Sequence, residues 1–189
     1  MTYLKKALLQ AHELCENLVH EGDTVIDATM GNGNDTLFLA RLVGPTGKVH
    51  AFDIQRLALE RTREKLTHEN VMEQCELIQD GHEHLDQYVK EPVKLVIFNL
   101  GYLPKGDHTI GTRAETTIAA VEKSLEILRN DGMIIIIIYY GGDSGFEERD
   151  TILDYLSRMD CRKYSVMKTE FINQINCPPI FIGIEKNPK

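Results

Sequence analysis

Three features are absent from this 189-residue sequence, and each absence excludes a class of protein. The four cysteines stand far apart with no C-x-x-C pair, so neither a zinc site nor a disulfide framework is indicated. The longest apolar run, residues 133–140, is too short to span a bilayer. The N-terminus leads directly into an amphipathic pattern and carries no export signal. We therefore expect a cytoplasmic protein that does not enter a membrane.

An excess of positive charge is also missing. The chain has 21 Lys and Arg against 29 Asp and Glu, which gives a net charge of −8. This balance excludes a protein that binds polyanions over its whole surface, so any nucleic acid must be bound locally. The length, with 42% apolar and 26% charged residues, suits one globular domain over residues 1–189, and no linker, repeat or low-complexity tract divides it.

What is present is an alternation of short β-branched runs with helical segments, the pattern of a parallel sheet covered by helices. Five isoleucines at 134–138 belong in the sheet interior, because an exposed strand of this kind would aggregate. Strands are predicted at 24–30, 48–54, 76–79, 93–100, 133–140, 164–171 and 180–185, and helices at 35–43, 56–68, a short stretch to about 89, 112–129 and 146–159.

The last two predicted strands are joined by a short loop without a helix, so they must run antiparallel. A dinucleotide dehydrogenase would instead continue to a sixth parallel strand. The sequence thus predicts an α/β fold with a mostly parallel seven-stranded sheet and a C-terminal antiparallel hairpin. This ending resembles the Rossmann-like fold of class I methyltransferases that use S-adenosylmethionine.

The loop after the first strand contains the candidate ligand site. It runs from Asp27 through Gly31-Asn32-Gly33 to Asn34, without the third glycine of the dinucleotide motif. Glycines at such a turn allow close approach of a ligand, and the following helix offers unpaired N–H groups. A carboxylate before the loop repels phosphate but attracts the ammonium of a methionyl group. The alternative is a plain turn in which Asn34 or Asp35 caps the helix.

Acidic residues also end the second and third strands. Asp53 lies twenty residues after Gly33 and is followed by Gln55, a place where a carboxylate accepts hydrogen bonds from ribose hydroxyls. Asp80 and His82 follow the third strand, within reach of an adenine amino group. Each acid alone suits a helix cap, but three at successive strand ends favour an adenosyl cofactor.

The fourth strand ends in Asn99-Leu100-Gly101-Tyr102. Amino-directed methyltransferases place Asp/Asn-Pro-Pro-Tyr/Phe here, and this chain keeps the first and last members. An amide oxygen that accepts an amine N–H aims the nitrogen lone pair, and an aromatic face packs on the substrate. Asn99 and Tyr102 are therefore the candidate catalytic residues, with an ordinary turn as the alternative.

These motifs resemble a small bacterial family long described as rRNA methylases and now associated with methylation of the tRNA wobble uridine. The resemblance covers nearly the whole chain. It implies S-adenosylmethionine as cofactor, 5-aminomethyl-2-thiouridine in the tRNA anticodon stem-loop as acceptor, and a homodimer. It also implies cofactor contacts from nine residues already singled out, namely Asp27, Asn32, Gly33, Asn34, Asp53, Gln55, Asp80, His82 and Asn99.

Two loops at the same sheet edge remain for the substrate. Candidate substrate-binding residues are Lys105, His108, Arg113, Asn173 and Gln174, which bind a polyanion locally or are merely solvated. His12, near the N-terminus, belongs to a possible basic strip that we interpret as a solvated helix face. His82 and His84 diverge and have no third partner, so no metal is expected. Two further alternatives are an N-methyltransferase acting on rRNA or a small metabolite amine, and a non-catalytic adenosyl-binding protein.

Overall fold

One sheet of seven strands runs through the molecule in the order β3-β2-β1-β4-β5-β7-β6. The structure, a computed structural model, describes residues 3–101, 111–141 and 145–188. Strand β7 is antiparallel to both β5 and β6, and the other pairs are parallel. The strands are β1 (Thr24–Asp27), β2 (Lys48–Phe52), β3 (Cys75–Ile78), β4 (Val93–Leu100), β5 (Leu128–Ile138), β6 (Tyr164–Thr169) and β7 (Ile180–Lys186). The predicted fold class is confirmed.

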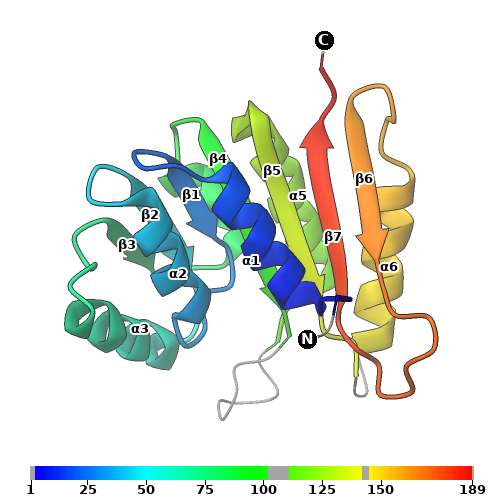
Figure 1. The fold of residues 1–189 in the computed structure, drawn as a ribbon, viewed down its shortest axis with the longest axis horizontal. Helices are drawn as coiled ribbons and strands as arrows, with labels where there is room; N and C mark the ends of the chain where they lie inside the picture. Colours follow the sequence, from blue (N-terminus) through cyan, green and yellow to red (C-terminus); the bar gives the residue numbers. More distant parts are fainter. Residues whose placement is uncertain (1–2, 102–110, 142–144, 189) are drawn as a thin grey trace.

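Helices cover both faces of this sheet (Figure 1). Helices α1 (Ala7–Leu18), α2 (Asn34–Val43) and α3 (Arg56–His68) lie on one face. The opposite face carries α4 (Leu85–Tyr88), α5 (Ala114–Ile127) and α6 (Gly145–Ser157), and a 3-10 turn, η1 (His82–His84), precedes α4. No helix in the described ranges is long and apolar enough to cross a membrane.

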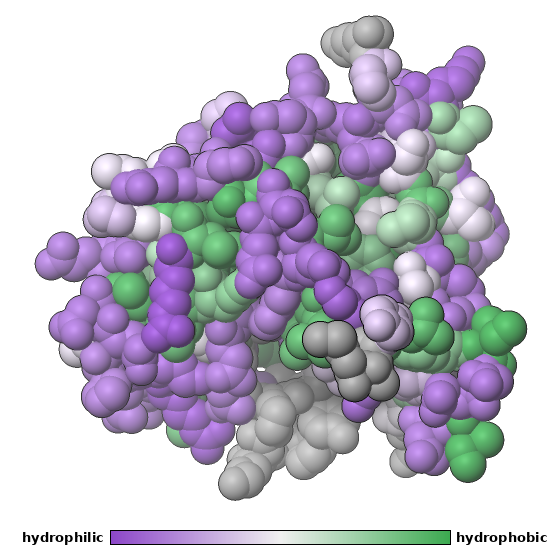
Figure 2. Space-filling view, in the orientation of Figure 1, coloured by the Kyte–Doolittle hydropathy of each residue, from purple (hydrophilic) through white to green (hydrophobic). Residues whose placement is uncertain are grey.

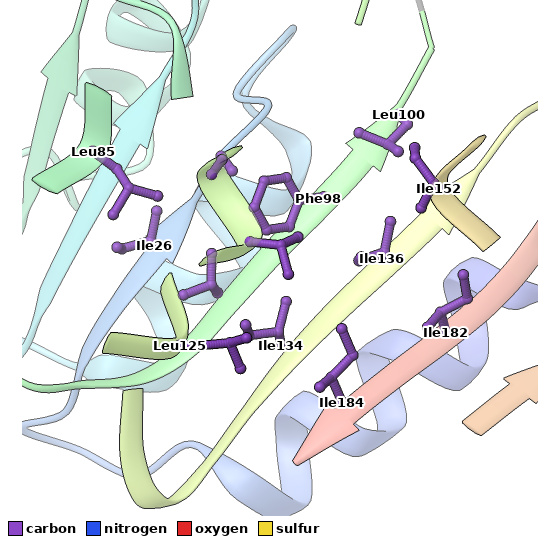
Figure 3. Close-up of a cluster of buried hydrophobic side chains, with 14 of the residues drawn as sticks. Ile26, Leu85, Phe98, Leu100, Leu125, Ile134, Ile136, Ile152, Ile182 and Ile184 are labelled. Atoms are coloured by element: carbon purple, nitrogen blue, oxygen red, sulfur yellow. The ribbon is translucent and has the colours of Figure 1, made fainter. Parts of the chain in front are cut away.

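The pleat of the central strands divides the core in two. Phe98, Ile134 and Ile136 point to the face of α5 and α6, where they join Leu125 and Ile152 in one aliphatic cluster (Figure 3). The intervening residues of β4 and β5 pack against α1 and α2 in a second cluster. All five isoleucines at 134–138 are fully buried, as predicted. Alternation with a period of two therefore decides which helices each side chain meets.

Several boundaries differ from the prediction. β1 ends at Asp27 instead of residue 30, because the chain turns there toward α2. β5 begins at Leu128, five residues before the prediction, and its register with β4 shifts between Val93 and Leu95. This irregularity accommodates residues 130–132, which lie between the predicted helix at 112–129 and the predicted strand at 133–140.

The topology determines which edge of the sheet carries the candidate site residues. The carboxyl ends of β1 to β4 lie along one edge of the sheet, as parallel strands require. In Figure 1 the connection between β6 and β7 reaches the same edge, and so does the start of the chain. Segments far apart in sequence thus surround one set of strand ends.

Candidate active site at the carboxyl edge of the sheet

Asp27, the last residue of β1, is almost completely buried, with 1% of its surface exposed. Its Oδ2 accepts a hydrogen bond of 2.6 Å from the Thr36 hydroxyl, and its Oδ1 accepts one of 3.1 Å from the Thr29 backbone N–H. Burial, and then the nearby charge of Asp35, raise the pKa of Asp27 well above its usual range. Both oxygens are used inside the chain, and the predicted contact with a methionyl ammonium stays a prediction.

Asp53 organises the loop that follows β1. It accepts the Gly31 N–H at 3.0 Å on one oxygen and the Gln55 N–H at 2.8 Å on the other. Burial raises the pKa of Asp53, and these two hydrogen bonds oppose the shift. The carboxylate is half-buried and keeps further lone pairs, so it can still accept ribose hydroxyls.

Gly33 has a structural role besides its predicted contact with a cofactor, which stays a prediction. Its backbone is left-handed, with φ of 70°, and it caps the N-terminus of α2. A Cβ at this position would lie 2.6 Å from the Thr62 hydroxyl of α3. The glycine therefore permits the loop to pack on α3, which the spacing alone did not indicate.

Asn32 and Asn34 point to α3 in this structure. Arg61 donates to the Asn32 side-chain oxygen at 3.1 Å, and Lys65 donates to the Asn32 backbone carbonyl at 2.6 Å. Lys65 also donates to the Asn34 side-chain oxygen. These contacts fix the loop, and the roles of the two asparagines toward a cofactor stay predictions.

Asp80 and His82 follow β3. Asp80 accepts hydrogen bonds from His84 at 2.9 Å and from the Tyr88 hydroxyl at 2.8 Å. The His84 hydrogen bond is the main cause that lowers the pKa of Asp80, so the group is an anion at neutral pH. Asp80 is half-buried and therefore accessible to a ligand at this edge.

His82 is buried and lies edge-on to the Phe98 ring. Its Nδ1 lies 3.0 Å from the Ala28 carbonyl, which can only accept, so Nδ1 carries the proton. Burial lowers the pKa of His82 and keeps the ring neutral. Its Nε2 has no hydrogen-bond partner among the residues that the structure describes. A buried acceptor of this kind suits a ligand that donates an N–H.

Asn99, near the end of β4, is held from two sides. Its backbone N–H donates to the Thr29 hydroxyl at 2.7 Å. Its side-chain Nδ2 donates to Oδ2 of Asp35, in the first turn of α2, at 3.0 Å. The other oxygen of Asp35 lies 2.8 Å from Nε2 of His12 on α1. Tyr102, the second predicted catalytic residue, lies outside the described residues.

Sequence reasoning missed Thr29, Asp35 and His12 as site residues. From the sequence, Asp35 was interpreted only as a residue at the start of a helix, and His12 was interpreted as part of a solvated helix face. Structurally, Asp35 is 8% exposed and His12 stacks on the Phe38 ring at 4.1 Å, so the interpretation of His12 as solvated was wrong. One signal was available: Asn99 stands directly between Phe98 and Leu100 in the strand, so the pleat turns it to the opposite face from theirs, which is the face of α2.

Of the predicted substrate residues, Arg113 is exposed at the N-cap of α5, and Asn173 and Gln174 are exposed between β6 and β7. Lys105 and His108 lie outside the described residues. Ile172 and Ile175 flank the two amides and are 94% and 91% exposed. In Figure 2 hydrophobic side chains protrude at the lower right, where Figure 1 shows this connection.

Comparisons with known proteins identify related sequences and structures. A family model described as "Putative rRNA methylase" matches residues 49–185. The "tRNA (mnm(5)s(2)U34)-methyltransferase, chloroplastic" of Arabidopsis thaliana is 36% identical over 184 residues, which cover 92% of this chain and 67% of that protein.

Two solved structures are similar over nearly their whole length. A "putative rRNA-methylase" from Clostridium thermocellum has a TM-score of 0.97 at 53% identity, covering 98% of this chain and 100% of its own. A "putative methyltransferase" from Streptococcus mutans, in complex with SAH, has a TM-score of 0.89 at 41% identity and covers 97% of this chain and 99% of its own.

Proposed function

The chain belongs to the rRNA methylase family and is a methyltransferase that uses S-adenosylmethionine, and from this premise we propose its acceptor: the amine of 5-aminomethyl-(2-thio)uridine at the tRNA wobble position. The product is the 5-methylaminomethyl form. The observation that carries this proposal is the oriented amide of Asn99 at the end of β4. The name of the Arabidopsis relative supports the same acceptor.

The residues at the strand ends fit the cofactor chemically. Asp53 and Asp80 present carboxylates for hydroxyl and amino donors, and His82 Nε2 offers a buried acceptor. The charges of Asp35 and Asp80 give the site negative potential, which suits a sulfonium and an ammonium. When bound, S-adenosylmethionine supplies a methyl group on positively charged sulfur, so no strong base is needed to activate a neutral amine.

Asn99 provides the positioning. Its Nδ2 is directed to Asp35, so Oδ1 is the atom left to accept an N–H of the substrate amine. Accepting one N–H directs the nitrogen lone pair, which forms the new carbon–nitrogen bond while the electron pair of the carbon–sulfur bond returns to sulfur. The product ammonium then loses a proton to solvent. Tyr102 is proposed to pack against the uracil ring.

The RNA is proposed to contact the loops around this edge, through Arg113, Asn173 and Gln174, and through Lys105 and His108. Lys105 and Arg113 supply positive charge locally on a chain of net charge −8, and the two amides supply hydrogen-bonding groups. A phosphate backbone held in this way loses counterions, so tRNA binding should weaken steeply with added salt. A small metabolite amine, which the acidic composition favours as a second candidate, would show almost no salt dependence.

The test is transfer of labelled methyl to tRNA that carries the aminomethyl wobble base. We expect label in this tRNA and none in a matched transcript with unmodified uridine. Calorimetry with S-adenosylhomocysteine measures cofactor binding separately. Intact cofactor binding without transfer to the aminomethyl tRNA would refute the proposed acceptor.

A further inference from the structure

Asp35 connects three segments that lie far apart in sequence. It lies in the first turn of α2, 8% exposed. Its Oδ1 lies 2.8 Å from Nε2 of His12 on α1, and its Oδ2 lies 3.0 Å from Nδ2 of Asn99 on β4. Each oxygen of one carboxylate is thus committed to a different element.

The chemistry of a carboxylate fixes the orientation of both partners. An ionised carboxylate only accepts hydrogen bonds, so the Asn99 amide must turn its NH₂ toward Asp35 and its carbonyl oxygen away. The same argument places a proton on Nε2 of His12. The Asn99 backbone cannot shift to compensate, because its N–H is bonded to the Thr29 hydroxyl at 2.7 Å. The amide therefore has one favoured orientation.

His12 is itself held in place. Its ring stacks on Phe38 of α2 with centroids 4.1 Å apart and planes inclined by 18°. On the same helix Ala11 and Cys15 are fully buried against the sheet, which anchors α1. The hydrogen bond to Asp35 therefore joins two packed helices, and it fixes the plane of the carboxylate.

The charge of Asp35 also acts on its surroundings. Burial is the main cause that raises the pKa of Cys15 on α1, of Asp27 on β1 and of Tyr139 after β5, and the charge of Asp35 adds to each shift. Burial lowers the pKa of Lys65 on α3, and the charge of Asp35 opposes this shift. Groups on several elements around Asp35 thus experience its charge. His12 is the histidine that pairs with it among the described residues.

We propose that Asp35, held by His12, is a positioning residue for methyl transfer: it locks the Asn99 amide so that Oδ1 faces the acceptor amine. This rests on the proposed function in one respect, namely that the acceptor is an amine with an N–H to donate. Neither Asp35 nor His12 needs to touch the substrate in this role. The lock raises the fraction of bound amine that is aimed at the methyl group.

Three variants and a control test the lock by steady-state kinetics. Asp35→Asn keeps the shape but can present either an N–H or an oxygen to Asn99, so we expect kcat to fall about 10-fold to 100-fold. The Kd of S-adenosylhomocysteine should change less than about threefold. The control, Glu16→Gln, removes one charge from the exposed side of α1 and should leave both quantities unchanged.

Two variants of His12 separate the effect of its hydrogen bond from the effect of its packing. His12→Gln retains a side-chain N–H and should keep kcat within about threefold of wild type, whereas His12→Phe fills the space without a donor and should lose about tenfold. Equal losses in both variants, accompanied by equal falls in Tm, would show that His12 only supports the fold and would overturn its part in the proposal.

A measurement without tRNA distinguishes failure of this proposal from failure of the proposed function. In the 15N-labelled protein, the side-chain NH₂ signal of Asn99 is assigned by its loss in Asn99→Ala. We expect slow hydrogen exchange for this signal in wild type and a clear shift with faster exchange in Asp35→Asn. Identical signals in the two proteins would overturn the lock. An unchanged lock in an enzyme that does not methylate aminomethyl tRNA would instead refute the acceptor.

Discussion

The two faces of strand β4 differ although their side chains alternate along one short run of residues. Toward α5 and α6, Val96, Phe98 and Leu100 continue an unbroken aliphatic core. Toward α1 and α2, the apolar residues Leu95 and Ile97 are followed by Asn99. Both faces of the sheet therefore bury apolar side chains, and the carboxyl end of the face toward α1 and α2 also supplies polar groups for chemistry.

This difference shows how a buried strand can present a polar side chain to the reaction with little loss of stability. Asn99 stands where the strand leaves the core, and its backbone N–H and side-chain NH₂ donate hydrogen bonds to Thr29 and Asp35. Buried polar groups without partners are expensive, so the helices that bring those partners are part of the site. The following variants test whether the two faces are separable.

The largest effect on stability should come from the aliphatic face. Ile136→Ala removes a fully buried side chain from β5 and should lower the free energy of unfolding by about 2–5 kcal/mol. Denaturant unfolding measures this loss. Because the side chain of Ile136 lies in the cluster with α5 and α6, on the opposite face of the sheet from Asn99 and Asp35, the Kd of S-adenosylhomocysteine should stay within about twofold. A larger loss of affinity in the folded variant would show that the faces are not separable.

Asn99→Ala is the counterpart on the polar face. Removing one oriented hydrogen-bonding group should lower kcat about 100-fold, equivalent to about 3 kcal/mol of transition-state stabilisation. Cofactor affinity and Tm should change little, since Asn99 is only half-buried. Single-turnover kinetics and calorimetry provide the measurements. A loss of cofactor affinity as large as the loss of rate would place Asn99 in the cofactor site.

Asp27 should make the stability of the ligand-free protein depend on pH. Burial raises the pKa of Asp27 to about 7. A raised carboxyl pKa stabilises the fold fully below the ordinary aspartate pKa of about 4, and this contribution is lost as pH rises toward the folded value. Asp27→Asn carries no charge at any pH. We therefore expect its Tm, relative to wild type, to increase by several degrees between about pH 4 and pH 7.

The matched control for this titration is Asp154→Asn on the exposed side of α6. An exposed ion pair contributes little to stability, so its Tm difference should be nearly flat over the same range. A flat difference for Asp27→Asn as well would contradict the raised pKa.

The smallest effect is expected for two buried threonines, one on each face of the sheet. Thr36 donates its hydroxyl to Asp27, whereas the hydroxyl of Thr117 on α5 has no partner among the described residues. Thr36→Val should lower the free energy of unfolding by about 1 kcal/mol. The loss should be larger at pH 8 than at pH 5, because the hydroxyl stabilises the charged form of the Asp27 carboxylate. Thr117→Val should be neutral or stabilising. Equal costs for the two variants would remove the proposed distinction between the faces.

Much of the fold was predictable because periodicity specifies it directly. The bounds of α3 and β4 match the prediction, and the isoleucines of β5 are buried as expected. The end of β1 was predicted three residues too far, because Thr29 has β propensity but lies in the turn before α2. Strand ends depend on such turns, which local propensity does not determine.

The predicted acids do lie at the strand ends, whereas the lock on Asn99 was not predicted. Asp35 and His12 meet only because α1 and α2 pack on the same face of the sheet. Periodicity shows that α1 has an apolar stripe, but it does not say which end of the sheet receives His12. Side-chain pairs between distant segments are therefore the part of the site that needed a structure.

The most direct test of the central claim is mass spectrometry of wobble nucleosides from a strain in which the gene is deleted. We predict accumulation of the 5-aminomethyl form and loss of the 5-methylaminomethyl form. Complementation with wild type should restore the methylated nucleoside, and Asn99→Ala at equal protein level should not. An unchanged nucleoside profile in the deletion strain would contradict the account.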